Sequence, residues 1–444
     1  MSAKLNLQQP RSSRSSIRLI TNWVLFVLAV ILGVVGAVFA FFGAAFITTS
    51  VIGLSVAALL VCFVISSGLA SLAARGIFPA RRTRMAWGVG IGTTLLTVLI
   101  AVVTIFRPLA SPAEPLQLPP RANYWDLSTG SHIAYLRVPA MGAAKATPII
   151  RVHGGPGAFA VTNESSVNFF GQLARDGYDV YFYDQIGSGL SARLENPKDY
   201  TVTRHIEDLE AIRQTIGVDK VILIGESWGG TLVANYMAVY PERVAKAIFT
   251  SAAPINPAEW NKYQDDLAPR LSPERQQQFN SLMNHPRFWA TYLLQIINPQ
   301  AAHDFVSDRE LDGFGDTFVA VQLPALSCNP ASLSSWQVPH GFGGWAALRG
   351  GSDLFAKRDT MNPRGRLASN QTPVLILRGE CDHIKWDVTY QYKTTFSQST
   401  LLYFPGGGHI IYADQPVLYL AAVRAFLLDQ PPPLAPYTGT MPPN

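Results

Sequence analysis

The chain has 444 residues and a formal net charge of +5, so it is long enough for more than one domain and a large core. The charge is uneven, because the first 110 residues hold nine lysines and arginines and no acidic residue, which leaves −4 for the remainder. The acidic remainder has no basic stripe with interleaved aromatic residues, and this argues against nucleic acid as a partner.

Three uncharged apolar runs dominate the N-terminal region, at about residues 23–42, 51–72 and 87–106. Each has about the 20 residues that a helix needs to cross the hydrocarbon core of a bilayer. We therefore predict a membrane region at 1–107 with three transmembrane helices. The first run is too long for the apolar part of a signal peptide, and two more runs follow it. Glycines dilute the third run, and its loss would move the rest of the chain to the other side of the membrane.

The orientation follows from the basic residues around these runs, since positively charged loops stay in the cytoplasm. Basic residues gather before the first run and between the second and third, whereas the turn near Thr48 is uncharged; they are Lys4, Arg11, Arg14, Arg18, Arg75, Arg81, Arg82 and Arg84. This pattern places the N-terminus inside and the C-terminal domain on the outer face, in a bacterial inner membrane or a plasma membrane.

Two proline-rich stretches flank the rest of the chain. A proline-rich stretch at 108–123 predicts an extended linker, and a proline-rich tail occupies 430–444. Between them, short apolar runs alternate with amphipathic segments over 124–252 and 370–429, which indicates an α/β fold with a mostly parallel sheet. The intervening part, 253–369, is rich in aromatic residues, proline and glutamine, and we expect a helical cap there.

The alternation predicts individual elements of this α/β core. Strands are expected at 133–138, 148–152, 180–183, 221–224, 245–250, 374–377 and 401–404. Helices are expected at 203–216, 228–240 and 416–428.

The stretch VILIGESWGG at 221–230 passes from a buried strand into a glycine-flanked serine. A strand, the sequence G-x-S-x-G and then a helix form a nucleophile elbow, in which Gly225 and Gly229 must lack side chains and Ser227 is exposed above the sheet. The start of the following helix aims backbone N–H groups at the same point. We predict that Ser227 is a catalytic nucleophile.

A serine nucleophile needs a base and an acid, which follow it in this order: acid, then histidine. His409 lies directly after the last predicted strand and is the expected base. Asp382 lies a few residues after the strand at 374–377 and is the expected acid, with Glu380 as its competitor. Such a carboxylate fixes the imidazole tautomer and stabilises the imidazolium. His383 is expected to be a structural neighbour.

The oxyanion needs backbone amides, one from Trp228 after the nucleophile and one from a loop after an earlier strand. HGGPG at 153–157 follows such a strand, and its glycines let the backbone approach a substrate carbonyl.

Together these motifs resemble the prolyl iminopeptidase family of α/β-hydrolases, serine peptidases that remove an N-terminal residue. The resemblance covers roughly 134–429 and rests on HGGPG, on DQIGSGLS at 184–191, on SWGG at 227–230, and on Asp382 and His409. It implies an α/β-hydrolase fold, the triad Ser227, Asp382 and His409, and Gly155 with Trp228 as the oxyanion donors. Asp184 is expected to brace a loop beside the site.

Two features depart from that family. The membrane region is absent from its soluble members, and the tryptophan-plus-glutamate cap motif that would hold a substrate amine has no match here. The acidic residues of the cap are better explained as a solvated surface; they are Asp265, Asp266, Glu274, Asp304, Asp308, Glu310 and Asp316. Glu226 is a weak candidate for substrate binding, although a buried hydrogen-bonding role is preferred.

Three hypotheses remain for function: a membrane-anchored serine aminopeptidase acting on short peptides, an esterase or lipase-like hydrolase acting on small esters, and an inert membrane sensor. An intact triad argues against the third. No zinc-like spacing or phosphate loop occurs, so neither metal nor cofactor is expected. Besides substrate, the expected partner is the lipid bilayer. Cys328 and Cys381 are compatible with one disulfide or with two free thiols.

Overall fold

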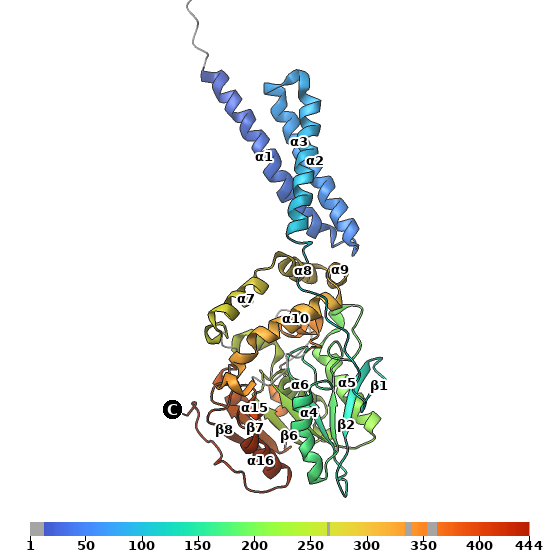
Figure 1. Cartoon of the computed structure of the whole chain (residues 1–444), viewed down its shortest axis with the longest axis vertical. Coiled ribbons are helices and arrows are strands. Elements are labelled where there is room, and N and C mark those ends of the chain that lie inside the picture. Colours follow the sequence, from blue (N-terminus) through green and yellow to red (C-terminus); the bar gives the residue numbers. More distant parts are fainter. Residues whose placement is uncertain (1–12, 264–266, 334–339, 353–361, 444) are drawn as a thin grey trace, which may run out of the picture. The chain divides into compact units, whose positions relative to one another are not determined.

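The computed structural model describes residues 13–263, 267–333, 340–352 and 362–443, so Lys4 and Arg11 lie outside the described residues. The chain forms two compact units (Figure 1). One comprises residues 1–108 together with 285–306, and the other comprises 109–284 and 307–444.

The first unit contains three long helices, α1 (Ser13–Ala44), α2 (Val51–Ile77) and α3 (Arg82–Val103). All three are long and apolar enough to cross a membrane. Glycines lie where these helices pack, since a Cβ on Gly36 would stand 2.5 Å from Ile65 and one on Gly90 would stand 2.8 Å from Phe63. Small residues at such positions let apolar helices approach closely.

Two short helices from the predicted cap also belong to the first unit. They are α8 (Pro286–Ile297) and α9 (Pro299–Phe305), which are joined at Asn298. The chain therefore passes between the two units at three places, and the linker that follows α3 is only one of them.

The second unit is built on a sheet in the order β1-β2-β4-β3-β5-β6-β7-β8. β1 and β2 are antiparallel to their neighbours, whereas β3 to β8 pair in parallel. In chain order, the strands are β1 (Ala122–Asp126), β2 (His132–Val138), β3 (Ile149–Val152), β4 (Val180–Tyr183), β5 (Val221–Glu226), β6 (Val244–Thr250), β7 (Val374–Gly379) and β8 (Ser399–Phe404). All seven predicted strands are present, and the mostly parallel α/β fold is confirmed.

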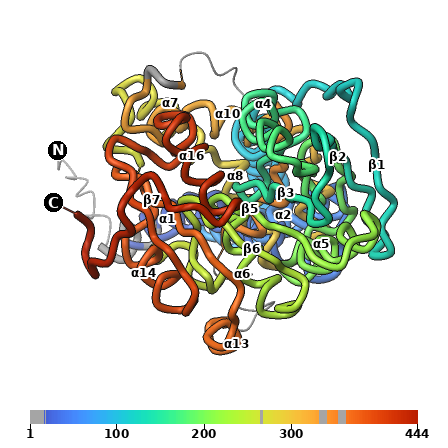
Figure 2. The backbone as a smooth tube through the Cα atoms, turned by 90° about the horizontal axis from the view of Figure 1, so that it is seen from below, coloured from blue at the N-terminus to red at the C-terminus, as the bar shows by residue number. Residues whose placement is uncertain are grey.

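Helices cover both faces of this sheet (Figure 2). α4 (Glu164–Phe170) and α16 (Pro416–Leu427) lie on one side, and α5 (Val202–Ile216), α6 (Trp228–Val239) and α14 (Trp386–Thr395) lie on the other. On the side of α4 and α16, apolar residues of the strands and helices form one core, to which α16 contributes Tyr419, Val423 and Leu427. This core fixes the carboxyl ends of the parallel strands, where the candidate site lies.

The described residues of the predicted cap form helices and turns and no strand. In the second unit these helices are α7 (Pro273–Met283), α10 (Asp308–Gln322), α11 (Gly344–Gly350) and α13 (Arg364–Leu367), and α15 (Ile411–Asp414) follows β8. Short 3₁₀ turns occupy Pro79–Arg81, Gly171–Asp176, Pro197–Asp199, Pro241–Arg243, Pro257–Tyr263, Ala268–Arg270, Leu323–Leu326 and Pro330–Leu333.

The proline-rich stretches are packed against the second unit. In the linker, the Leu109 amide donates to Glu310 and the Ala113 amide donates to the Arg309 carbonyl at the start of α10. In the tail, the Tyr437 amide donates to the Leu401 carbonyl of β8. Both stretches therefore follow the surface of the fold.

Candidate active site

The turn between β5 and α6 has the geometry of a nucleophile elbow. Ser227 has a φ of 52°, a left-handed conformation that is costly for a residue with a side chain. A Cβ on Gly225 would lie 2.6 Å from the Gly229 carbonyl oxygen, and one on Gly229 would lie 2.1 Å from the carbonyl oxygen of Val152. Both glycines are therefore required by close backbone contacts, as the sequence motif predicts.

The loop after β3 lies against this elbow. A Cβ on Gly154 would lie 3.1 Å from the Ser227 Cβ and 3.7 Å from its Oγ. The next residue, Gly155, has a φ of 115° and precedes a cis bond to Pro156. The structure thus brings together the loop of one predicted oxyanion donor, Gly155, and the turn of the other, Trp228.

A second pair of residues holds the 153–157 loop in place. His153 is buried, which lowers its pKa to about 3, so the imidazole is neutral and its Nε2 accepts a hydrogen bond of 2.9 Å from the Gln185 amide. The Gln185 side chain donates in turn to the His153 carbonyl at 2.8 Å. Sequence reasoning assigned no role to Gln185, although it is the second residue of the DQ motif.

Asp184 braces a neighbouring loop, as expected. Its carboxylate is fully buried and accepts hydrogen bonds from the amides of Ala160, Val161 and Leu190 at 2.7–2.9 Å. A Cβ on Gly189 would lie 2.1 Å from the same carboxylate, which explains the second glycine of DQIGSGLS. The motif therefore has a structural role beside the site.

The predicted acid and base meet at the ends of β7 and β8. Nδ1 of His409 lies 2.7 Å from Oδ1 of Asp382, which also accepts a bond of 3.1 Å from the Ile384 amide. The other carboxylate oxygen accepts a bond of 3.0 Å from the buried guanidinium of Arg378. Burial opposes ionisation of Asp382, but Arg378 and His409 outweigh it and hold the carboxyl pKa below its usual range.

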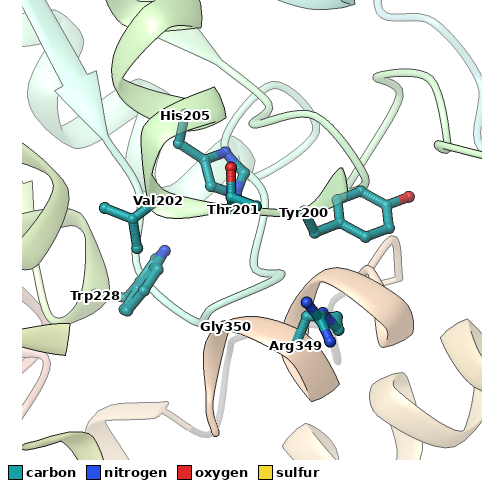
Figure 3. Close-up of a pocket in the computed structure, with 7 residues that line it drawn as sticks. All are labelled: Tyr200, Thr201, Val202, His205, Trp228, Arg349 and Gly350. Atoms are coloured by element: carbon teal, nitrogen blue, oxygen red, sulfur yellow. The ribbon is translucent and has the colours of Figure 1, made fainter. Parts of the chain in front are cut away.

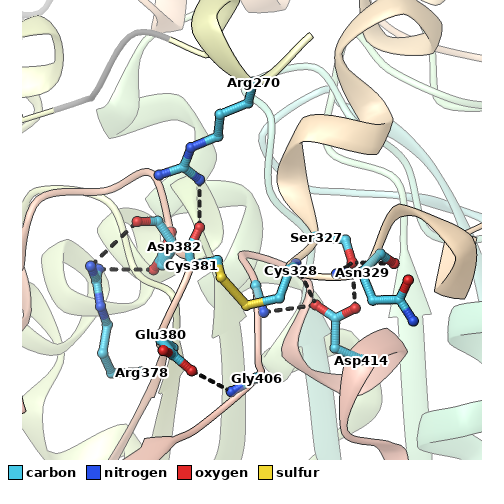
Figure 4. The surroundings of a disulfide bond; sticks show 11 residues. Arg270, Ser327, Cys328, Asn329, Arg378, Glu380, Cys381, Asp382, Gly406 and Asp414 are labelled. Carbon is cyan, nitrogen blue, oxygen red and sulfur yellow. Dashed lines mark hydrogen bonds and ion pairs between the residues drawn. A yellow bond between two sulfur atoms is a disulfide. The ribbon is translucent and has the colours of Figure 1, made fainter. Parts of the chain in front are cut away.

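Two other titratable residues of this loop, Glu380 and His383, have different surroundings. Glu380 is exposed, and its Oε2 accepts a bond of 2.7 Å from the Gly406 amide (Figure 4). His383 is buried and lies against His409, with ring centroids 4.2 Å apart. Burial and the neighbouring His409 lower the pKa of His383 to about 3, so it is a neutral neighbour of the base.

A disulfide joins this loop to the cap (Figure 4). Cys381, directly before the predicted acid, is bonded to Cys328, with the two Cα atoms 5.3 Å apart. The segment that holds Cys328 also touches the base, because the Leu326 carbonyl accepts a bond of 2.7 Å from the His409 amide. The pairing that the sequence left open is therefore present, and it links the acid and base loops to one cap segment.

Asp414 was not singled out in the sequence, yet it ties the same segments together. Its carboxylate accepts hydrogen bonds from the amides of Gly408 at 2.7 Å and Cys328 at 3.3 Å, and from the Ser327 hydroxyl. It thus anchors the loop before His409.

Among the described residues, one group of three has metal-ligand character. The ligand atoms of Asp382, His383 and His409 lie within 4.8 Å of one another. The carboxylate, however, is already bonded to the Arg378 guanidinium and to His409. We therefore interpret the group as a proton-transfer pair with a histidine neighbour.

The comparisons with known proteins agree with this geometry. The model of the family described as "alpha/beta hydrolase fold" matches residues 147–416. The chain belongs to this family. A proline iminopeptidase from Flavobacterium johnsoniae is 25% identical over 289 residues, which are 63% of this chain and 89% of the relative. Another, from Heyndrickxia coagulans, is 27% identical over 306 residues, which are 67% and 96%.

Two solved structures are similar to the chain at lower identity. The proline iminopeptidase of Mycobacterium smegmatis is 19% identical, covers 69% of this hydrolase and 98% of its own chain, and has a TM-score of 0.47. A thermophilic esterase from Thermogutta terrifontis is 18% identical, covers 69% and 98%, and also has a TM-score of 0.47. The curated relatives confirm the predicted resemblance of the hydrolase to prolyl iminopeptidases.

Glu226 of the hydrolase, the weak candidate for substrate binding, forms an ion pair with Arg151 of β3. Both side chains are largely buried, and Arg151 also lies over the ring of Phe170, 4.6 Å from its centroid. A substrate amine would have to compete with this internal guanidinium. The arrangement favours the structural interpretation of Glu226.

Two acidic residues of the cap have local partners, and Asp316 is buried, so it does not belong to the solvated surface that was expected for these residues. Asp316 accepts hydrogen bonds from the amides of Gly341 and Phe342, and Asp304 accepts one from Gln300. Asp265 and Asp266 lie outside the described residues. Substrate recognition by the cap is thus not assigned to a carboxylate.

A glycine-rich cap segment at 340–344 lies against the site loops, and sequence reasoning missed it. The Gly343 amide donates to the Gly157 carbonyl at 2.7 Å, and the Gly189 amide donates to the Gly341 carbonyl at 2.7 Å. A Cβ on Gly343 would lie 1.9 Å from the Gly187 carbonyl oxygen. The cluster of glycines in HGFGG was the available signal for this contact.

A small pocket lies behind the elbow (Figure 3). Its lining residues are Tyr200, Thr201, Val202, His205, Trp228, Arg349 and Gly350. The Trp228 side chain forms one wall, and its buried Nε1 has no hydrogen-bond partner among the described residues. The pocket includes none of the three triad residues, and we do not assign it to substrate.

Proposed function

We propose that this hydrolase is a membrane-anchored serine aminopeptidase that releases an N-terminal residue, of the proline type, from short peptides. The observation that carries the proposal is the buried hydrogen bond between Asp382 and His409 beyond β7 and β8, on a sheet whose β5 ends in the Ser227 elbow. The carboxyl ends of parallel strands lie at one edge of a sheet, which is where α/β-hydrolases carry out their chemistry.

The proposed reaction is an acyl transfer through the serine. His409 takes the proton from the Ser227 hydroxyl as its oxygen attacks the substrate carbonyl, and Asp382 stabilises the imidazolium that forms. The amides of Gly155 and Trp228 hold the negative carbonyl oxygen of the tetrahedral intermediate. His409 then protonates the leaving amine, and water releases the acyl group by the same steps in reverse.

The substrate class comes from the relatives, which are named proline iminopeptidases. The membrane part comes from the three helices that are long and apolar enough to span. We place the catalytic unit on the outer face, because the basic loops favour it and because disulfides such as Cys328–Cys381 persist in oxidising compartments.

The test compares two substrate types on the full chain in detergent. We expect turnover of a prolyl arylamide, and we expect Ser227→Ala to lower it by about 10⁶-fold and to abolish labelling by a fluorophosphonate probe. Ser369→Ala, at an exposed serine after α13, is the matched control and should keep full activity.

Four outcomes would change the proposal. Hydrolysis of p-nitrophenyl esters without arylamide turnover would support the esterase alternative. Labelling without turnover of either substrate class would direct the search to other substrates. Full labelling of Ser227→Ala would show that the elbow serine is not the nucleophile, and an unreactive wild-type chain would favour the inert sensor.

A further inference from the structure

Helices α8 and α9 form a hairpin that packs on the ends of the apolar helices within the first unit. At its bend, the Asn298 side chain donates a hydrogen bond of 2.9 Å to the Ala45 carbonyl, directly after α1. At its end, the ring of Phe305 lies 5.9 Å from that of Phe41 and 5.7 Å from that of Phe106. The hairpin is thus held by the loop after α1 and by the chain after α3.

The one charged residue of α8 is directed into this packing. Arg287 is buried, and its guanidinium donates bonds to the carbonyl oxygens of Ile105 at 2.9 Å and Phe305 at 2.7 Å. It also lies over the Phe305 ring, 4.4 Å from the centroid. Because this charge is used internally, the outward face of α8 carries none.

The outward face is apolar. Trp289 and Leu293, one turn apart, are 49% and 45% exposed, and Tyr292 and Ile296 beside them are half-buried. A helix that faces water presents polar or charged residues there. Tryptophan is instead enriched at the level of the lipid headgroups, where its ring is partly apolar and its N–H finds a partner.

The neighbouring loop has the same character. Phe46 and Ile47, directly after the Ala45 carbonyl that Asn298 binds, are 76% and 90% exposed. No charged residue occurs in 41–56, and at this end the exposed Arg107 follows α3. The opposite ends of α2 and α3 carry Arg75 and Arg82, with Arg81 in the turn between them. The exposed apolar surface of α8 therefore continues into that of the apolar helices, at the end with fewer basic residues.

We infer that the α8–α9 hairpin is a second membrane contact of this protein, through the apolar face of α8, which lies in the boundary between headgroups and acyl chains at this end of the helices. The lipid bilayer covers the apolar face of the hairpin, since this face continues the surface that the spanning helices present to lipid. The inference rests on the proposed membrane anchoring and adds to it that a segment of the cap is embedded as well. Such an interfacial segment binds through buried apolar area.

The test measures the surroundings of a nitroxide label on single cysteines. The full chain with Cys62→Ser, its disulfide intact, receives Leu293→Cys, Val64→Cys in the middle of α2, or Val417→Cys on α16, and a maleimide nitroxide is attached. Val64 and Val417 are 65% and 83% exposed, so they serve as the lipid and the water reference. Each variant is reconstituted in vesicles of phosphatidylcholine and phosphatidylglycerol, and its arylamide turnover is checked.

Collision rates with oxygen, which concentrates in lipid, and with a water-soluble nickel chelate give the result. We expect the ratio of oxygen to nickel collisions at Leu293 to be several-fold higher than at Val417. The ratio at Val64 should be higher than at Val417 in the same way. A Leu293 ratio equal to that of Val417, with Val64 in lipid, would overturn this inference alone. If Val64 also behaves like Val417, the membrane anchoring fails, and the inference fails with it.

Discussion

Asp382 is buried and yet ionised because two nitrogen-bearing side chains surround it. His409 and Arg378 each bond one of its carboxylate oxygens, and together they overcome the cost of burial. Removal of one partner from a buried, hydrogen-bonded pair leaves an uncompensated group, which costs several kcal/mol. Single substitutions around this carboxylate are therefore informative.

The first prediction separates the two acids of the loop. Asp382→Asn keeps the shape but cannot stabilise an imidazolium, so we expect turnover to fall by about 10⁴-fold. Glu380→Gln removes only an exposed contact with the Gly406 amide and should change turnover little. Steady-state assays of both variants decide the question, and the opposite ranking would assign the role to Glu380.

The second prediction concerns Arg378. The ionised form of Asp382 stabilises the fold fully above the ordinary carboxyl pKa of about 4, and this stabilisation is lost as the pH falls through the lower pKa of the folded state. Arg378→Gln removes the guanidinium, so the pKa of Asp382 should rise toward its ordinary value. The ionised carboxylate should then stabilise the fold less, and the stability of the variant should change less with pH below about 4.

The measurement is the pH dependence of turnover and of thermal unfolding. Arg366→Gln, at an exposed arginine of α13, is the matched control and should keep the wild-type profile. If thermal unfolding of Arg378→Gln depends on pH below about 4 as in the wild type, the guanidinium does not set the ionisation of Asp382.

At the scale of elements, the 340–344 segment of the cap meets the core through backbone hydrogen bonds. Gly343 →Ala tests this contact, because the new Cβ would lie 1.9 Å from the Gly187 carbonyl oxygen. We expect a loss of about 1–3 kcal/mol in unfolding free energy and a fall in turnover, since Gly343 is bonded to the 153–157 loop.

The control for that substitution is Gly365→Ala in α13. An added Cβ there meets no heavy atom within 4 Å, and alanine favours a helix more than glycine does. Denaturant unfolding and turnover are measured for both variants. Equal behaviour of the two would mean that the 340–344 segment can shift at no cost.

The elements were predictable from the sequence where the signal is local. The buried strands β4 and β5 are short apolar runs bounded by turns, and the elbow glycines carry their own steric reason. β1 was not predicted, because most of its side chains are not buried and it begins within the proline-rich stretch at 108–123. It is an edge strand that pairs with β2.

The site was predictable in part for the same reason. Ser227, Asp382 and His409 follow from motif and chain order, whereas the partners of the loops do not. In the sequence, nothing distinguishes Arg378 from other strand residues. Asp414 bonds the Cys328 amide, which is 86 positions away in the sequence. Such contacts depend on how the chain folds back on itself, which periodicity does not report.

At the scale of the whole molecule, the proposed membrane anchoring leads to a prediction about the side on which the hydrolase unit lies. Arginine and lysine near the ends of spans resist translocation, so the loop between α2 and α3 should stay in the cytoplasm. A fusion of alkaline phosphatase after Pro120 should then be exported and active in bacteria. A fusion after Ile77, at the end of α2, is the matched control and should be inactive.

A cytoplasmic reporter at the same two junctions should give the reverse pattern. An inactive phosphatase after Pro120, together with an active cytoplasmic reporter there, would mean that α3 does not span and that the hydrolase works on cytoplasmic substrates.

The bond between Cys328 and Cys381 closes a ring of chain that contains the 340–344 segment, α11, α13 and β7. One break of the backbone anywhere inside this ring would release no fragment, because the bond still joins the two pieces. The acid loop would stay attached to the segment that holds the His409 amide. For an enzyme proposed to work outside the cytoplasm, where peptidases can cut it, the bond keeps the loops of Asp382 and His409 attached after a single cut.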